Sequence, residues 1–153
     1  MIKILFICHG NICRSPMAEF LLKDMVTKAG IAQDFYIASA ATSTEEIGNP
    51  VHRGTRSKLA QYHISTDGKR AVQLTKDDYD KYDYLIGMDT WNIKNMLRIL
   101  PEDKEGKVFR LLDITDHPRD IADPWYTGNF DETYDDIKEG CEALLKKYKN
   151  STR

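Results

Sequence analysis

Cys8 and Arg14 are separated by five residues, a spacing at which a nucleophile and a planar cation can share one short loop. A cysteine thiolate is a nucleophile, and a neighbouring positive charge favours the thiolate over the thiol. The guanidinium of an arginine can bind two oxygens of one phosphate group. We therefore expect Cys8 to attack a phosphate ester whose oxygens are held by Arg14.

The residues on either side of this loop indicate how it is built. Ile4-Leu5-Phe6-Ile7 is an apolar run typical of a short buried strand. Ser15-Pro16 is typical of a helix start, with a hydroxyl at the cap and proline in the first turn. A loop from a strand end to a helix start directs backbone N–H groups toward its own centre and binds anions. The residues expected to form this substrate-binding cradle are His9, Gly10, Asn11, Ile12, Cys13 and Ser15.

The whole chain has the composition of an ordinary globular protein. Its 153 residues, 41% of them hydrophobic, predict one domain with a buried core. A net charge of −2 without a basic stripe gives no reason to expect nucleic acid as a partner. The apolar runs are too short for a membrane span or a signal peptide, so we expect a cytoplasmic protein with reduced cysteines. No metal site is expected, because nothing completes a ligand set around Cys8, His9 and Cys13.

Strand-like runs alternate with helical patterns, which predicts an α/β domain with a parallel sheet. The predicted strands are Lys3–Cys8, Tyr36–Ala40, Tyr84–Met88 and Val108–Leu112. The predicted helices are Pro16–Ala29, Val51–Tyr62, Trp91–Leu100 and a last helix with apolar positions from Tyr134 to Tyr148. Cys141 lies on the apolar face of this last helix and is expected in the core. We expect His52, His63 and His117 to lie at the surface or to have their hydrogen bonds satisfied.

One connection, from Asp113 to Asn129, is long and has no clear helix or strand pattern. Such loops are usually functional, and loops that follow parallel strands gather at one edge of the sheet. Asp123 in this loop is the best candidate for a general acid and base. Trp125 and Tyr126 follow it and could form a wall for an aromatic leaving group. Two other carboxylates of the loop, Asp116 and Asp120, are alternatives.

Cys8–Pro16 resembles the loop of the low-molecular-weight protein tyrosine phosphatases, which reads Cys-x-Gly-Asn-x-Cys-Arg-Ser-Pro. Further segments match the family in order and spacing: Ser39–Ser43, Glu46–Pro50, Asp83–Asp89 and Asp123–Tyr126. The resemblance covers essentially the full chain. It implies a four-stranded parallel sheet with helices on both faces, in a Rossmann-like or flavodoxin-like arrangement. It also implies phosphotyrosine hydrolysis in proteins through a phosphocysteine, without metal or organic cofactor.

By the same resemblance, Cys8 is the nucleophile, Arg14 binds phosphate and Asp123 is the general acid and base. Asn11 would hold the loop's shape in a left-handed conformation. Ser15 would donate a hydrogen bond to the Cys8 sulfur. Ser39 would support Asn11, and Lys69 replaces a histidine that supports this network in some members.

The expected cleft entrance differs from that of other members. Glu45 stands where members commonly carry an aromatic residue, and its charge is expected to disfavour acidic residues beside the phosphotyrosine. His9 faces the cleft mouth, and Trp125 with Tyr126 match the family's paired aromatic residues. Cys13 is either a buried small side chain or a thiol that traps oxidised Cys8 as a disulfide.

Three other functions remain open at this point. Phosphoarginine phosphatases carry threonine where this chain has Ile12, so Ile12 favours phosphotyrosine. Thiol-coupled arsenate reductases need two further cysteines close together, and the chain has only Cys141. A silent phosphate-binding module should lack the nucleophile or the acid. The expected partners are tyrosine-phosphorylated proteins, with inorganic phosphate or other oxyanions as ligands, and the enzyme is expected to be a monomer.

Overall fold

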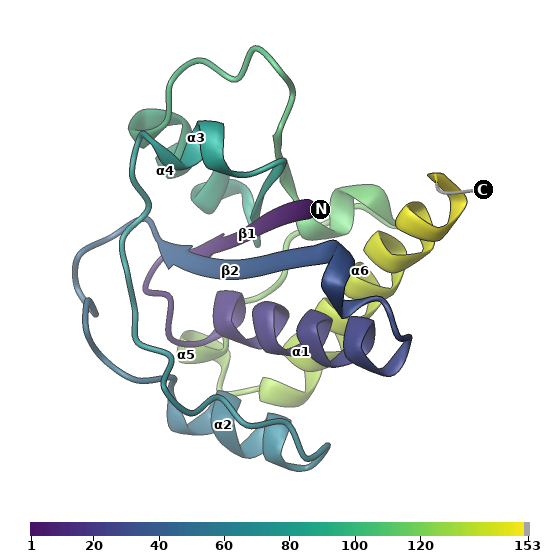
Figure 1. Ribbon diagram of the computed structural model, residues 1–153. Helices are drawn as coiled ribbons and strands as arrows, with labels where there is room; N and C mark the ends of the chain where they lie inside the picture. Colours follow the sequence, from purple (N-terminus) through teal and green to yellow (C-terminus); the bar gives the residue numbers. More distant parts are fainter. Residues whose placement is uncertain (152–153) are drawn as a thin grey trace.

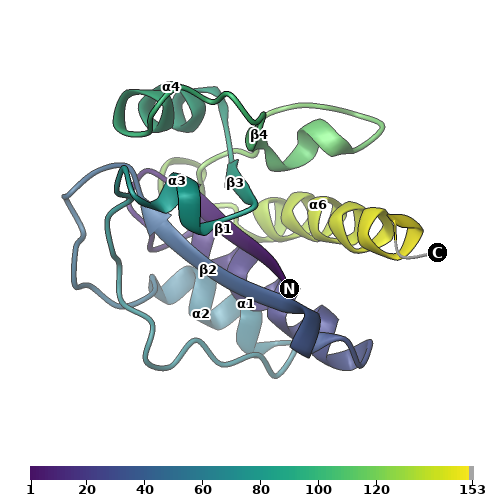
Figure 2. The ribbon, with the colours of Figure 1, turned by 45° about the horizontal axis from the view of Figure 1, so that its top comes forward.

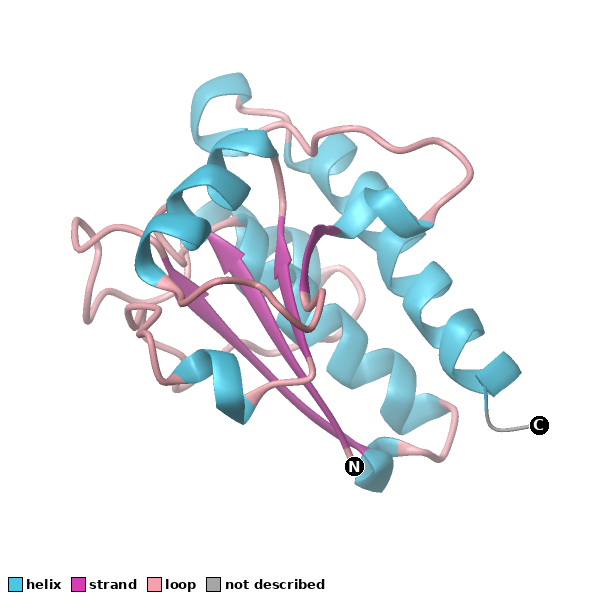
Figure 3. Ribbon diagram, turned by 90° about the horizontal axis from the view of Figure 1, so that it is seen from above, coloured by secondary structure: helices cyan, strands magenta, loops and turns pink. Residues whose placement is uncertain are grey.

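Four parallel strands form the sheet, in the order β2-β1-β3-β4. The computed structural model describes residues 1–151, and Figure 3 shows the strands running in one direction. Their bounds are Ile2–Cys8 for β1, Phe35–Ala41 for β2, Tyr84–Gly87 for β3 and Val108–Arg110 for β4. All four predicted strands are present. The last is shorter than predicted, because a 3₁₀ helix, Leu111–Ile114, begins directly after Arg110.

Strand β1 lies in the middle of the sheet and is covered on both faces. Ile4 and Phe6 belong to one core cluster, and Leu5 and Ile7 belong to another. Successive side chains of a strand point to opposite faces, so these clusters lie on the two sides of the sheet. This explains why the strand reads as a continuous apolar run rather than as an alternating one.

Helices cover both faces of the sheet, as the resemblance implies. The first cluster includes side chains of α1 (Arg14–Lys28), α2 (Arg53–Ala60) and α6 (Phe130–Ser151). The second includes side chains of α3 (Asp78–Lys81) and α4 (Thr90–Ile99). Figures 1 and 2 show α4 on one side of the strands and α1 with α2 on the other.

Two local predictions are wrong. Helix α1 begins at Arg14, and Cys13 rather than Ser15 is its N-cap. The Ser15 hydroxyl does not cap the helix because it bonds to side chains of the preceding loop. The connection from Asp113 to Asn129 is also not devoid of helix, because it contains α5 (Pro124–Thr127).

The strand order determines where a ligand site can form. The chain passes from β1 to β2 on one side and then to β3 on the other, so the direction of winding reverses between β1 and β3. Open α/β sheets bind ligands in the crevice beyond the strand ends at such a point. Cys8 is the last residue of β1, and Asp89 follows shortly after β3. Within residues 1–151, no helix combines the length and apolar character needed to cross a bilayer.

Candidate active site

A pocket of about 110 Å³ lies beyond the end of β1. Its lining residues are Cys8, His9, Gly10, Ile12, Cys13, Arg14, Glu45, Glu46, Asp123, Trp125 and Tyr126. A larger open groove of about 830 Å³ lies between residues 114–117 and α6, but neither the cysteine nor the arginine lines it. Chemistry rather than volume therefore identifies the smaller pocket as the site. Among the described residues, no group of histidine, cysteine and carboxylate side chains could hold a metal ion.

The loop after Cys8 curls around its sulfur. The Sγ atom lies 3.3 Å from the backbone N of Asn11 and 3.0 Å from the hydroxyl of Ser15. Asn11 has φ of 59°, which confirms its predicted left-handed conformation. Its side-chain oxygen accepts a hydrogen bond from the backbone N–H of Val72. This bond to Val72 holds the loop in this shape.

The hydrogen bonds of Asn11 set the direction of two hydroxyl protons. Its Nδ2 group donates to Ser15 Oγ at 2.8 Å and to Ser39 Oγ at 2.9 Å, which uses both amide hydrogens. Ser39 in turn donates to the buried carboxylate of Glu19 at 2.5 Å. The Ser15 hydroxyl keeps its own proton for the Cys8 sulfur. Asn11 and Ser15 do not line the pocket with the other loop residues, but lie behind the sulfur.

Lys69 contacts the same buried network from outside the loop. Its Nζ donates to the backbone oxygen of Ser39 at 2.9 Å and lies 3.9 Å from Glu19 Oε1. Burial lowers the pKa of Lys69, and the Glu19 carboxylate acts against this shift. The contact with Ser39 places Lys69 where the resemblance implies a supporting side chain.

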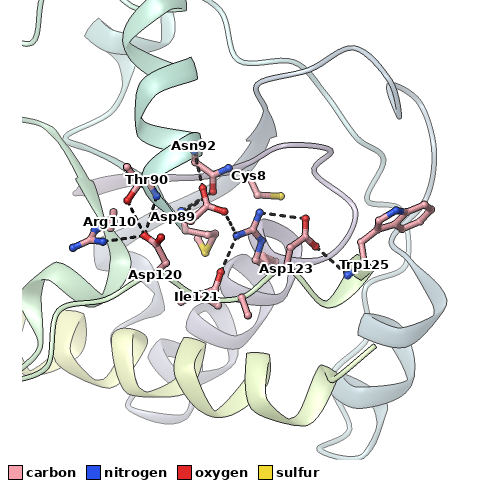
Figure 4. A network of polar contacts seen from close by, with 12 residues as sticks. Cys8, Asp89, Thr90, Asn92, Arg110, Asp120, Ile121, Asp123 and Trp125 are labelled. Atoms are coloured by element: carbon pink, nitrogen blue, oxygen red, sulfur yellow. Dashed lines mark hydrogen bonds and ion pairs between the residues drawn. The ribbon is translucent and has the colours of Figure 1, made fainter. Parts of the chain in front are cut away.

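Arg14 is buried at the base of the pocket and is held by three acceptors. Its Nη1 donates to Asp89 Oδ2 at 2.6 Å and to the Ile121 oxygen at 2.9 Å, while Nη2 lies 3.4 Å from Asp123 Oδ2. Figure 4 shows Asp89, Ile121 and Asp123 converging on this point. Burial acts to lower the pKa of Arg14, but negative charge at Cys8 and Asp89 raises it above its ordinary value.

Asp89 is a site residue that the sequence analysis did not assign. Its Oδ1 accepts from the backbone N–H of Asn92 at 2.7 Å, so the same carboxylate caps α4 and fixes Arg14. The available signal was its position two residues after the end of β3, at the edge where the winding of the sheet reverses. Glu46 also lines the pocket without having been predicted there.

The three carboxylates of the long loop lie in different places. Asp123 lines the pocket and caps α5, because its Oδ1 accepts from the backbone N–H of Trp125 at 3.0 Å. Asp120 instead accepts from Thr90 and from Arg110. Burial opposes the shift, but these hydrogen bonds lower the pKa of Asp120. Asp116 lines the larger groove. Asp123 is therefore the candidate acid that shares the pocket with Cys8.

The pocket mouth combines charged and aromatic side chains. His9 Nε2 lies 2.7 Å from Glu45 Oε2, and both side chains are exposed. Trp125 and Tyr126 are 56% and 83% exposed, so their rings stand in solvent beside the opening. This places the four predicted entrance residues around one mouth.

The other two cysteines have different surroundings. Cys13 lines the pocket but is buried, and burial together with the negative charge of Cys8 raises the pKa of its thiol to about 12. Cys141 is fully buried in the core under α6, where burial raises its pKa even further. A second pair of exchangeable thiols beside Cys8 is therefore not available within residues 1–151.

Comparisons with known proteins agree with this arrangement. A family profile described as low molecular weight phosphotyrosine protein phosphatase matches residues 3–153. The low molecular weight protein-tyrosine-phosphatase YfkJ of Bacillus subtilis is 43% identical over 147 residues, which are 95% of this chain and 94% of YfkJ. PtpA of Staphylococcus epidermidis, of the same description, is 37% identical over 95% of this chain and 92% of its own.

Solved structures show the same relationship. The crystal structure of YfkJ superimposes with a TM-score of 0.94 at 41% identity, covering 100% of this chain and 98% of YfkJ. A protein tyrosine phosphatase from Entamoeba histolytica superimposes with a TM-score of 0.90 at 27% identity, over the whole of both chains. The chain therefore belongs to the low molecular weight phosphotyrosine protein phosphatase family.

Proposed function

We propose that this protein hydrolyses phosphotyrosine in proteins through a covalent phosphocysteine on Cys8. The observation that carries the proposal is the meeting of Cys8 and Arg14, from one loop, with Asp123, from a distant part of the chain, in one small pocket. Membership of a phosphotyrosine phosphatase family supports the same reaction. A silent phosphate-binding module would not need both a nucleophile and an acid in this place.

In the first step, the Cys8 thiolate attacks phosphorus. The S–P bond forms as the bond to the tyrosine oxygen breaks. Asp123, in its acid form, gives its proton to that oxygen, so tyrosine leaves as a neutral phenol. The contacts of Arg14 use three of its five N–H groups, which leaves two for the phosphate oxygens. Its fixed orientation means that little reorganisation is needed as charge moves toward the leaving oxygen.

In the second step, the Asp123 carboxylate accepts a proton from water while the water oxygen attacks phosphorus. The S–P bond breaks, inorganic phosphate leaves, and the Cys8 thiolate is restored. Ser15 O–H and Asn11 N–H both point to the sulfur and stabilise its negative charge. One carboxyl group thus serves as acid and then as base.

The lining of the pocket supports an aromatic phosphate ester as substrate. Trp125 and Tyr126 line the pocket, where aromatic rings can pack against a phenyl group. Ile12 is an apolar lining residue, which suits an uncharged phenyl ring better than the charged guanidinium of phosphoarginine. The fully buried Cys141 gives no support to a thiol-coupled arsenate reductase.

The surroundings in which this enzyme works are part of the proposal. The compartment we propose is the cytoplasm, whose reducing conditions keep a nucleophilic thiol such as Cys8 active; Cys8, Cys13 and Cys141 are not joined by disulfides within residues 1–151. The partners are tyrosine-phosphorylated proteins, and free phosphate competes with them for the same loop. The protein acts as a monomer, because the residues of one chain suffice to form the pocket.

The test is phosphate release by the wild-type protein and by Cys8→Ser from three substrates, in the presence of EDTA. Release from a phosphotyrosine peptide but not from a phosphoserine peptide, lost in the variant, is the expected result. Release mainly from phosphoarginine would assign the other substrate class. Phosphate binding without release from any substrate would instead support a silent binding module.

A further inference from the structure

His52 lies between two aromatic rings that come from the far end of the chain. Its imidazole stands edge-on to the Trp125 ring, with ring centres 5.6 Å apart. On its other side it stacks on the Phe130 ring at 5.4 Å with an angle of 14° between the planes. Since Trp125 lines the pocket and is more than half exposed, the imidazole supports one side of an otherwise open wall.

The same residue is fixed to the phosphate-binding loop. The backbone N–H of His52 donates to the Ile12 oxygen at 2.8 Å. Three residues later, the Thr55 hydroxyl donates to the Cys13 oxygen at 3.1 Å. The start of α2 is therefore attached at two points to the loop that carries the nucleophile.

The orientation of the imidazole is itself set by a hydrogen bond. His52 Nδ1 accepts from the backbone N–H of Gly54 at 3.0 Å, which makes His52 the N-cap of α2 and leaves its ring proton on Nε2. A β-carbon on Gly54 would lie 2.2 Å from the Phe130 ring, so this ring packs directly on the backbone of the first turn. Phe130 also packs against the cluster of Ile12 and Cys13. The stack is therefore seated on the catalytic loop and does not extend freely into solvent.

We propose that His52 is a positioning residue for substrate binding. Its ring packs against the Trp125 ring and restricts that ring's motion. This contact connects the segment that carries Asp123 to the loop that carries Cys8. The proposal rests on the proposed function, because the wall matters only if an aromatic phosphate ester binds there. The contact acts on the aryl group of the substrate rather than on the phosphate.

Two substitutions separate the ring contact from the helix cap. His52→Asn keeps a side-chain acceptor for the Gly54 N–H, since asparagine is a favoured N-cap, but it removes the ring. His52→Phe keeps a ring between Trp125 and Phe130 but removes the cap. His52→Asn should raise KM for an aryl phosphate about two- to tenfold, the range expected for one lost aromatic contact. For an alkyl phosphate, KM should stay unchanged, and kcat should change less than KM.

His52→Phe should instead lower the melting temperature and leave the KM for the aryl phosphate near its wild-type value. The double variant His52→Asn with Trp125→Ala should raise KM for the aryl phosphate no more than Trp125→Ala alone does, because both substitutions remove the same contact. Equal rises in KM for aryl and alkyl phosphates in His52→Asn would overturn the proposal. Rises in KM for the aryl phosphate that add up in the double variant would overturn it as well. Unchanged kinetics in His52→Asn would also overturn it.

A second measurement does not depend on turnover. In a Trp91→Phe background, Trp125 is the remaining tryptophan, and its time-resolved fluorescence anisotropy reports nanosecond ring motion. The fast component should grow in His52→Asn and stay unchanged in His52→Phe. If the enzyme hydrolyses no phosphate ester, the proposed function fails while this result still tests the contact. Identical anisotropy decays in the His52→Asn and unsubstituted backgrounds would show that His52 does not hold the ring.

Discussion

Asp89→Ala should destabilise the fold and disturb the site together, because one carboxylate holds both Arg14 and the start of α4. The side chains of Arg14 and Asp89 are 3% and 18% exposed, so the pair is largely buried. Removing one partner of a buried ion pair costs about 3–5 kcal/mol, and losing an N-cap costs about 1 kcal/mol. Arg14 keeps its contacts with Ile121 and Asp123, which partly compensate its charge. We therefore expect a loss of about 4 kcal/mol in the free energy of unfolding.

Denaturant unfolding measures this loss, and Asp120→Ala is the matched control. Asp120 pairs with Arg110 near the same helix, but these side chains are 49% and 25% exposed. An exposed pair contributes about 1 kcal/mol or less, and the hydrogen bonds that Asp120 accepts from Thr90 add about 1 kcal/mol, so the control should lose no more than about half as much stability as Asp89→Ala. Asp89→Ala should also lower kcat/KM at least about tenfold, because Arg14 loses its fixed orientation. Equal, small losses of stability in both variants would refute this account of Asp89.

Three further outcomes follow from the site. Asp123→Asn should slow hydrolysis of phosphotyrosine about 10²–10⁴-fold and hydrolysis of an activated aryl ester much less. Asp120→Asn should change neither rate. The reverse pattern in steady-state kinetics would assign the acid to Asp120. Glu45→Lys should raise the ratio of kcat/KM for acidic phosphopeptides to kcat/KM for neutral ones about two- to fivefold at low salt. An unchanged ratio would show that Glu45 does not act on specificity. Mild peroxide should link Cys8 to Cys13, which peptide mass spectrometry detects. Formation of the Cys8–Cys13 disulfide should become faster as the pH rises, because burial raises the pKa of the Cys13 thiol and its thiolate is the form that attacks oxidised Cys8. An unlinked pair after oxidation would contradict this role for Cys13.

The sequence predicted the sheet well because its strands leave strong local patterns. The run from Ile4 to Ile7 is apolar throughout, since both faces of β1 are buried. The start of α1 was predicted less well, although Ser15-Pro16 is a strong capping signal. The Ser15 hydroxyl is committed to Cys8 and Asn11, and this tertiary contact overrides its capping preference.

The partners within the site were harder to predict than its chemistry. Asp89 is 75 residues away from Arg14 along the chain, so no local pattern announces their contact. Glu19 lies within a helix and resembles a surface carboxylate until its bond to Ser39 is known. His52 was expected only to lie at the surface or to have its hydrogen bonds satisfied. These pairings depend on how distant elements pack, which a single sequence does not state.

The most direct test of the central claim is to trap the phosphocysteine. Asp123→Asn lacks the base of the second step, so rapid acid quenching with an activated aryl phosphate should catch the intermediate in this variant. Peptide mass spectrometry should then find one phosphoryl group on Cys8, with a matching burst of released phenol, and neither in the double variant with Cys8→Ser. Turnover of that ester without a burst, or a phosphoryl group on another residue, would contradict covalent catalysis by Cys8.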